Sequence, residues 1–407
     1  MDGRRSDSIK TPSVHSPEAL SHARAETDAS GQNFFFKDPI MKNADSNAVF
    51  PFFPLSDLDM EKLSFHESTE TFPLHMPDEY QFLHEAAAIE FHGTVFAAWY
   101  NNREKELQGE TVIRGRRSAD GGKTWSDAEL IAKDPEGKLL YCPPVFGICD
   151  DQLYLLINTM VSADHMHSLD LYSFDENDQK FHFCRRSPIP FKLNTNVVHL
   201  PNGKLLLPGR IAEMDGFPTT PAVLIADSGK MDGEWRLVKI QKDGHMPDGS
   251  HLLHPELSAI AADSALCMFC RNDERQIPLL YRSDDLGEHW SGPFQHDIPF
   301  INSKIYSGTL SDGRNYAIGN IFRPGRDTAW NRDHLAIFFS EPHSMNFNKG
   351  FFLRDGEDRN LHLYPQWSYP SACEADGKLY IVYSMVAQKE NQSVRGAMMS
   401  IVDLKKV

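Results

Sequence analysis

The stretch Ser118-Ala-Asp-Gly-Gly-Lys-Thr-Trp125 recurs in the second half of the chain as Ser283-Asp-Asp-Leu-Gly-Glu-His-Trp290. Both copies follow a short strand-like run that ends in Arg-Ser, and both continue into another serine. The spacing has a physical reason. An aspartate accepts hydrogen bonds from the amides of a turn, a glycine supplies a positive φ, and a tryptophan fills the gap between neighbouring sheets. The repeat therefore predicts one β-turn that the fold uses more than once.

Two further sets of turns extend this pattern along the chain. Weaker copies of the same turn lie at Ser173–Asp175, Asp227–Gly229 and Ser340–Glu341. A second, tighter turn between apolar runs occurs at His92-Gly93, Asp150-Asp151, Asn202-Gly203, Asp263-Ser264, Asp312-Gly313 and Asp376-Gly377. Both signals recur about every 50–60 residues, and the runs between them alternate with the period of a strand. Six four-stranded antiparallel units over roughly 80–407 predict an all-β fold, a six-bladed β-propeller.

The chain before residue 80 has a different composition. Residues 1–45 are rich in Ser, Ala, Asp, Lys and His with little periodicity, which predicts a flexible N-terminal arm. The segment 46–80 carries several prolines and Phe50, which indicates an extended strap that packs on the propeller and completes its last blade. We therefore expect one propeller domain over 46–407. No signal peptide is visible, which indicates a cytoplasmic protein, or one secreted after loss of a signal.

Composition excludes several classes of function. Lys and Arg number 41 against 57 Asp and Glu, a net charge of −16, which argues against a nucleic-acid partner. No run approaches the roughly 18–20 apolar residues of a membrane span. Cys267 and Cys270 form a Cys-x-x-Cys pair inside an apolar run, and the sequence has no second such pair for a zinc site. We expect neither a metal nor a cofactor.

The turn Ser-x-Asp-x-Gly-x-Thr-Trp is the Asp-box, and the chain resembles the sialidase (neuraminidase) superfamily, in particular bacterial sialidase-like proteins with BNR repeats. The Asp-boxes indicate the fold and say little about chemistry. The resemblance implies a ligand site at the mouth of the central channel. It also implies three arginines that clamp a carboxylate, a nucleophilic tyrosine with a glutamate, and an acid/base residue.

The resemblance assigns the nucleophile to Tyr369, within Trp367-Ser-Tyr-Pro, and its base to Glu256, within His254-Pro-Glu. A neutral phenol approaches a carbon beside a carboxylate without charge repulsion, and a neighbouring glutamate can take its proton. The family places an acid/base aspartate on the loop after residue 99. This chain has no aspartate there, so Glu106 and Glu110 are the candidates.

The resemblance also implies the residues that bind the substrate. Arg271 and Arg332 match two clamp arginines, because a planar guanidinium holds a carboxylate through two hydrogen bonds. The alternative role of Arg271 is an ion pair with a nearby carboxylate such as Asp273. Further candidate contacts with the sugar are Arg103, Asn302 and Arg210.

The first clamp arginine is missing. The family opens its first blade with Arg-Ile-Pro, whereas this chain has Leu83-His84-Glu85 there. His84 would serve as a third cation, as a general base, or as a ligand to a neutral sugar.

These residues leave three functions open. The first is a glycoside hydrolase, an exo-α-sialidase-like enzyme that releases a terminal acidic sugar such as sialic acid from glycoconjugates. The second is a uronic-acid polysaccharide lyase, or another carbohydrate-active enzyme, in which His84 and Tyr369 transfer the proton. The third is a propeller that binds carbohydrate without catalysis. In the first two the partner carries an acidic sugar.

Overall fold

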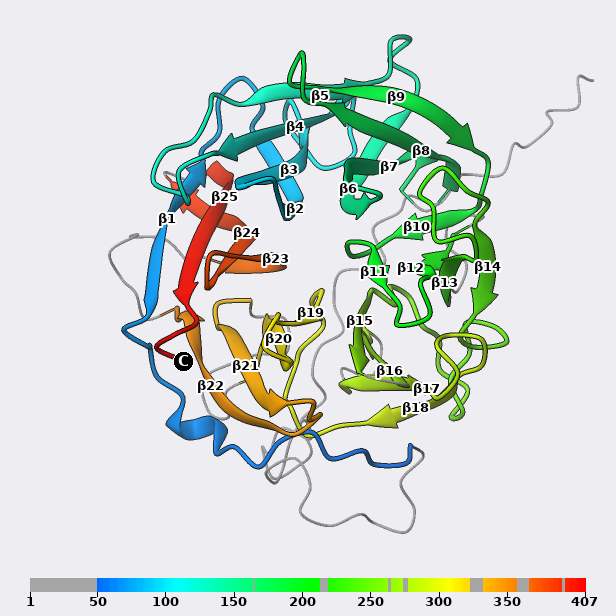
Figure 1. Ribbon diagram of the computed structural model, residues 1–407, viewed down its shortest axis with the longest axis vertical. Helices are drawn as coiled ribbons and strands as arrows, with labels where there is room; N and C mark the ends of the chain where they lie inside the picture. The colour runs from blue at the N-terminus through cyan, green and yellow to red at the C-terminus, as the bar shows by residue number, and fades with distance from the viewer. Residues whose placement is uncertain are drawn as a thin grey trace, which may run out of the picture. The chain divides into compact units, whose positions relative to one another are not determined.

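The computed structural model describes residues 50–163, 165–212, 219–262, 265–273, 277–322, 332–356, 366–389 and 392–407. Within them, six antiparallel sheets form a ring, which confirms the predicted six-bladed β-propeller (Figure 1). The predicted arm at 1–45 and the tight turn at Asp263-Ser264 lie outside the described residues. No helix in the described ranges is long and apolar enough to cross a membrane.

Each blade runs from an inner strand at the axis of the ring to an outer strand. Blade I contains β2 (Phe82–Phe91), β3 (Thr94–Asn102), β4 (Thr111–Ser118) and β5 (Glu129–Lys133), and blade II contains β6 (Leu140–Cys149), β7 (Gln152–Ser162), β8 (His165–Asp175) and β9 (Lys180–Ser187). Blade III contains β10 (Phe191–Leu193) with β11 (Val198–His199), β12 (Leu205–Ile211), β13 (Thr220–Ala226) and β14 (Arg236–Lys239), and blade IV contains β15 (Leu257–Ala262), β16 (Ala265–Cys270), β17 (Leu279–Ser283) and β18 (Ser291–Gln295). Blade V contains β19 (Tyr306–Thr309), β20 (Arg314–Asn320), β21 (Leu335–Pro342) and β22 (Phe347–Arg354), and blade VI contains β23 (Gln366–Ala375), β24 (Lys378–Lys389), β25 (Gln392–Asp403) and β1 (Thr69–His75).

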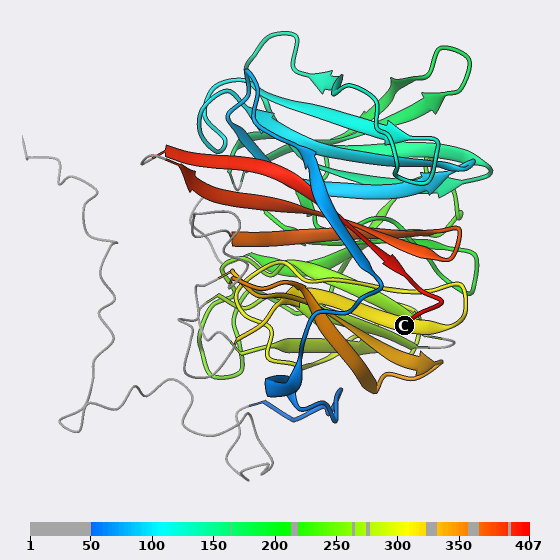
Figure 2. The ribbon, with the colours of Figure 1, turned by 90° about the vertical axis from the view of Figure 1, so that its left-hand side faces the viewer.

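The ring is closed by a strand from the beginning of the chain. β1 pairs antiparallel with β25, with Thr69 opposite Val402 and Phe72 opposite Met399. Figures 1 and 2 show this blue strand beside the red C-terminal strand. Blade VI therefore contains both ends of the propeller, and its ladder of backbone hydrogen bonds holds the ring shut.

The two full Asp-boxes connect the third and fourth strands of blades I and IV. In blade I, Asp120 accepts hydrogen bonds from the amide and the hydroxyl of Thr124, at 2.9 and 2.6 Å. Ser118 Oγ accepts from the amide of Gly122 at 2.9 Å, and the indole of Trp125 donates to the carbonyl of Gly122. The hydrogen bonds from Thr124, with that from Ser118, lower the pKa of Asp120 to about 2.

Each Asp-box packs against the preceding blade. Gly122 has a φ of +83°, and a Cβ there would lie 2.8 Å from the side chain of Ile401 and 3.0 Å from that of Tyr380, both in blade VI. Gly287 has a φ of +97°, and a Cβ there would lie 3.1 Å from the side chain of Leu206 in blade III. Glycine is thus required both for the turn and for the approach of neighbouring sheets.

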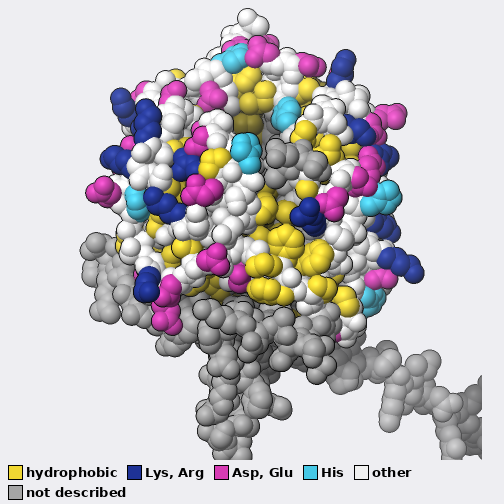
Figure 3. Space-filling view, turned by 60° about the horizontal axis from the view of Figure 1, so that its bottom comes forward, with side chains coloured by type: hydrophobic (Ala, Val, Ile, Leu, Met, Phe, Trp, Pro, Cys, Tyr) yellow, Lys and Arg dark blue, Asp and Glu magenta, His cyan; other side chains and the backbone are white. Residues whose placement is uncertain are grey.

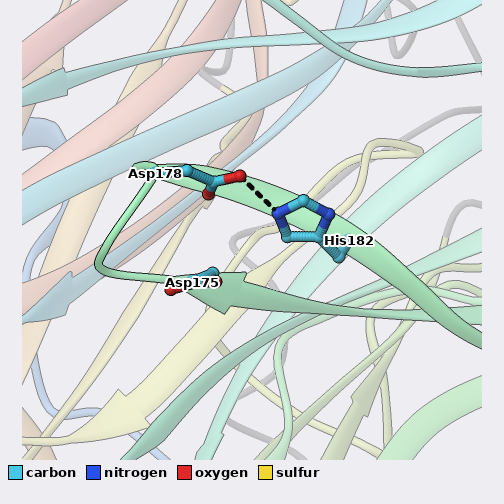
Figure 4. A group of neighbouring side chains, drawn as sticks. All are labelled: Asp175, Asp178 and His182. Atoms are coloured by element: carbon cyan, nitrogen blue, oxygen red, sulfur yellow. Dashed lines mark hydrogen bonds and ion pairs between the residues drawn. The ribbon is translucent and has the colours of Figure 1, made fainter.

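The weaker copies occupy the equivalent turns of blades II, III and V. In blade II, Asp175 accepts from the amide of Asn177 at 2.8 Å, and Asp178 pairs with His182 at 2.8 Å (Figure 4). The side-chain ligand atoms of Asp175, Asp178 and His182 lie within 4.8 Å of one another. These hydrogen bonds within the turn account for the arrangement.

The core lies between neighbouring sheets, where apolar side chains from adjacent blades interlock. One cluster joins Phe96 and Tyr100 of blade I to Phe146 and Leu155 of blade II. Trp125 and Trp290 pack at the edges of other clusters and are only half-buried. The sequence predicted that each tryptophan fills the gap between neighbouring sheets. Each is instead only partly enclosed, and its indole N–H donates to a carbonyl of its own turn.

Charged side chains of both signs are scattered over one face of the propeller. On the face shown in Figure 3, Lys and Arg side chains are interspersed with Asp and Glu side chains. On that face the acidic balance of the chain is therefore spread among compensating charges rather than gathered into one patch.

We expect Trp125→Ala to lower the free energy of unfolding by about 2 kcal/mol, less than the roughly 3–5 kcal/mol for a fully enclosed aromatic, because the indole is half-buried. Urea denaturation followed by circular dichroism measures this change. Phe183→Ala is the control, because that ring is 53% exposed. Equal effects of the two substitutions would contradict a packing role for the Asp-box tryptophan.

Candidate functional site

Ionisable side chains, most of them buried, gather at one end of the inner strands. Some of these residues lie at the beginning of a blade's first strand. The others lie in the loop before the first strand, in the loop before the third strand, or in the loop after the second strand. Because neighbouring strands of a blade are antiparallel, all these positions lie at the same end of the blade. The Asp-box turns follow third strands and lie at the opposite end. The group consists of His84 and Glu85 on β2, Glu256 before β15, Arg271 after β16, Lys304 before β19, Arg332 before β21 and Tyr369 on β23.

Two of these side chains sit on strained backbone. Tyr369 has a φ of 59° at a bulge between Ser368 and Ser371, and Glu85 has a φ of 46° at a bulge between His84 and Ala87. A positive φ at a residue other than glycine costs on the order of 1–3 kcal/mol and persists only where the surroundings impose it. Bulges re-aim side chains, and here they place a phenol and a carboxylate in the same buried group.

Arg271 is the centre of the hydrogen-bond network. Its Nη1 donates to Glu256 Oε2 at 2.8 Å and to the hydroxyl oxygen of Tyr369 at 2.6 Å. Its Nε and Nη2 donate to the two oxygens of Asp273 at 2.5 and 2.9 Å. These contacts use four of the five N–H groups of the guanidinium. Arg271 therefore makes the ion pair with Asp273 that the sequence left open, and it also joins the expected nucleophile to its expected base.

Burial and charge set opposite protonation states on the two partners of Arg271. Burial raises the pKa of Tyr369 above its usual range, although Arg271 opposes this, so the phenol is neutral. Burial also acts to raise the pKa of Glu256. The charges of Arg271, Arg210 and Lys304 outweigh that effect and hold the pKa of Glu256 well below its usual range. The site therefore holds a neutral phenol next to an ionised carboxylate.

His84 lies directly against the expected nucleophile. Its ring centroid is 4.1 Å from that of Tyr369, and its Nδ1 is 2.8 Å from Ser384 Oγ. Burial lowers the pKa of His84 to about 3. The imidazole is therefore neutral near pH 7, which fits a hydrogen-bonding or proton-accepting role better than a third cation.

The structure adds two residues that the sequence interpretation missed. Lys304 Nζ lies 3.2 Å from Glu85 Oε2 and 5.7 Å from the ring centroid of Tyr369. Both charged side chains are buried, and the thiol of Cys142 faces the other oxygen of Glu85 at 3.9 Å. Glu85 directly follows His84, so its place in the first-blade motif was the available signal. Nothing in the residues around Lys304 marks it as inward-facing.

Three of the candidate binding residues reach this group. The guanidinium carbon of Arg332 lies 5.3 Å from the ring centroid of Tyr369, and its Nη2 donates to the carbonyl of Asn302 at 3.1 Å. The amide of Asn302 is fully buried, and neither its Nδ2 nor its Oδ1 has a hydrogen-bond partner in the described ranges. Arg210 is buried on β12, and its charge acts on Glu256.

The loop after β3 carries three of the candidate residues, and their described contacts differ. Glu106 accepts a hydrogen bond from the hydroxyl of Tyr100 at 3.0 Å, and its charge acts on His84. Arg103 and Glu110 pair with each other at 3.6 Å, and Arg103 stacks on the ring of Tyr80 at 5.0 Å. The described contacts do not bring Arg103 or Glu110 to Tyr369.

The opposite end of the inner strands is chemically plain. A cavity of about 270 Å³ lies between β11, β15 and β19, with Asn196, His199, Tyr306 and Thr309 among its lining residues. No carboxylate, lysine or arginine lines this cavity within the described part of the chain. The candidate chemistry therefore belongs to the end that holds Tyr369.

Comparisons with known proteins agree with the fold. Residues 93–381 match the BNR repeat-like domain family. No curated protein matches the chain. Among solved structures, Trypanosoma rangeli sialidase in complex with 2,3-difluorosialic acid as a covalent intermediate is similar, with a TM-score of 0.63 at 15% identity over 84% of this chain. This chain covers 60% of that protein.

Two other solved structures give the same result. A leech intramolecular trans-sialidase complexed with 2,7-anhydro-Neu5Ac has a TM-score of 0.62 at 12% identity, over 81% of this chain and 69% of its own. A sialidase from Streptococcus pneumoniae has a TM-score of 0.60 at 10% identity, over 83% and 70%. At such identities the likeness shows the fold. With the family match across most of the propeller, it establishes that this chain belongs to the BNR repeat-like domain family and has the sialidase-like propeller fold.

Proposed function

We propose that this protein is a glycoside hydrolase that releases a terminal acidic sugar from a glycoconjugate. One observation carries the proposal. A buried, neutral tyrosine on a strained bulge shares one guanidinium nitrogen of Arg271 with the ionised carboxylate of Glu256. Buried ion pairs are common in structural roles, but a phenol held against them on strained backbone supports a reactive group.

The geometry suggests how the first half of the reaction proceeds. The oxygen of Tyr369 attacks the anomeric carbon, the bond from that carbon to the leaving oxygen breaks, and the phenol proton passes to Glu256. Arg271 already donates to the tyrosine oxygen, so it stabilises the negative charge that develops there. A neighbouring acid protonates the leaving oxygen, and water then cleaves the tyrosyl–sugar bond. Glu106 and the Glu85–Lys304 pair are the described groups placed for that proton.

Binding of an anionic substrate would also make Glu256 a stronger base. The positive charges around Glu256 hold its pKa low, which makes the resting carboxylate a weak base. A substrate carboxylate bound beside Arg332 and Lys304 neutralises part of that field, and the pKa of Glu256 then rises. Proton transfer from Tyr369 becomes easier only when the correct charge is bound. This coupling favours acidic over neutral sugars at the chemical step.

Arg332 is the cation best placed to hold a substrate carboxylate. It faces the ring of Tyr369, and its described polar contact is with the neutral carbonyl of Asn302. No carboxylate of the described ranges lies within ion-pair distance of it. Arg271, in contrast, has one N–H left, so it contributes a single hydrogen bond unless Asp273 moves away.

The contact between His84 and Tyr369 favours a second candidate, a lyase acting on a uronic acid. A neutral imidazole whose centroid is 4.1 Å from that of a neutral phenol can remove the proton from the sugar carbon next to the carboxylate, while the phenol protonates the leaving oxygen.

Elimination gives an unsaturated sugar that absorbs in the ultraviolet, and hydrolysis does not. We expect the protein to release sialic acid from 4-methylumbelliferyl sialoside and to give no absorbing product from uronic-acid polysaccharides. The reverse result would select the lyase, and no product from either would leave a binding propeller.

Tyr369→Phe should reduce turnover by roughly a thousandfold or more, because the nucleophilic oxygen is lost while the ring remains. Thermal unfolding and binding of an unreactive acidic sugar should change little. Tyr383→Phe is the matched control, since its buried hydroxyl lies in the same blade and contacts Ser400 at 2.9 Å. Wild-type turnover in Tyr369→Phe would exclude the assigned role.

The low pKa of His84 predicts a dependence of stability on pH. Between pH 6.5 and about 3 the unfolded chain binds a proton at His84 and the folded protein does not, so acid destabilises the fold. This group should contribute a loss of about 1.4 kcal/mol per pH unit below 6.5. His84→Asn, which keeps a polar partner for Ser384, should flatten the decline in unfolding free energy between pH 7 and 4.5. If the unfolding free energies of variant and wild type fall in parallel, His84 binds its proton equally well in the folded and the unfolded protein, and the low pKa is wrong.

A further inference from the structure

Arg395 lies on the side of blade VI that faces the group around Tyr369. On β25, Ala397 pairs with Ser384 of β24, and the hydroxyl of Ser384 contacts His84. Arg395 is two residues from Ala397, and alternate residues of a strand face the same side of a sheet. The side chain of Arg395 therefore projects on the same face as Ser384, toward blade I.

A row of ring contacts connects Arg395 with the expected nucleophile. Its guanidinium carbon lies 4.5 Å from the ring centroid of Phe82. The rings of Phe82 and His84 are 6.1 Å apart at nearly a right angle, and His84 is 4.1 Å from Tyr369. The charge of Arg395 also acts on His84. Arg395 of blade VI, over the ring of Phe82, and Arg332 of blade V, over the ring of Tyr369, are thus two cations near the His84–Tyr369 pair.

The contacts of Arg395 leave its hydrogen-bond donors available. A guanidinium that stacks on an aromatic ring uses its flat face, so its in-plane N–H groups can still bind an anion through two hydrogen bonds. Arg395 is half-buried, and no carboxylate of the described residues lies within ion-pair distance of it. Removing a guanidinium partly from water without an anionic partner is unfavourable, and a bound anion relieves that cost.

We propose that Arg395 binds the carboxylate of the substrate and takes the place of the first-blade arginine that is absent at His84. This inference rests on the proposed function, because it names the residue that selects an acidic sugar. Two nearby residues fit the task less well, since the imidazole of His84 is neutral and four N–H groups of Arg271 are already bonded. The clamp then consists of Arg332 and Arg395, and Arg395 comes from β25, the third strand of blade VI.

The test compares binding of an acid with binding of its neutral ester. The probes are the glycal 2-deoxy-2,3-didehydro-N-acetylneuraminic acid and glucuronic acid, each with its methyl ester, titrated calorimetrically at pH 7. The variants are Arg395→Gln, Arg395→Lys and the control Arg282→Gln, which removes a half-buried arginine paired with Asp284 at the Asp-box end. Melting temperatures show that each variant is folded.

We expect the wild type and Arg282→Gln to bind at least one acid more tightly than its ester. Arg395→Gln should reduce that ratio about 10- to 100-fold with ester binding unchanged, and Arg395→Lys should fall between them. If the wild type prefers an acid and both Arg395 variants keep the full ratio, the inference is wrong and the proposed function stands. If the wild type prefers neither acid, the proposed function and the inference both fail. Should Arg395→Gln not fold, the ratio for Arg395→Lys decides.

Discussion

The buried guanidinium of Arg271 is the interaction on which the candidate site depends. A charge removed from water needs partners of opposite sign and complete hydrogen bonding, and removing one partner of such a pair costs several kcal/mol. Asp273 and Glu256 supply the charge from blade IV, and Tyr369 supplies a hydroxyl from blade VI. Blade VI is completed by β1, which pairs with β25, so the strand that closes the propeller also completes the blade that carries Tyr369.

Much of the fold could be predicted from the sequence because its turns are local. Asp120 and Gly122 act within a few residues of each other, so their spacing indicated the structure directly, and the tight turns gave the number of blades. The depth of Trp125 could not be read in the same way, because it depends on how far the neighbouring sheet extends.

The site was predicted less completely, since its contacts join distant parts of the chain. The resemblance to sialidases selected Tyr369, Glu256 and Arg271, which the structure brings together. It did not select Glu85 or Lys304, because a bulge in β2 turns that glutamate inward and no pattern in the sequence encodes the bulge. Arg103 matched a motif, and its described contacts are with Tyr80, Glu79 and Glu110.

Local charge and overall charge have opposite signs in this protein. The chain carries −16, yet Arg210, Arg271, Lys304, Arg332 and Arg395 all lie around Glu256, His84 and Tyr369.

The proposed function requires that Tyr369 becomes covalently attached to an acidic sugar. The most direct measurement is intact mass spectrometry after incubation with 2,3-difluorosialic acid, the compound seen as a covalent intermediate on the Trypanosoma rangeli sialidase. We expect one added sugar per chain, and peptide mapping should place it on Tyr369. No adduct, or an adduct on another residue, would contradict it.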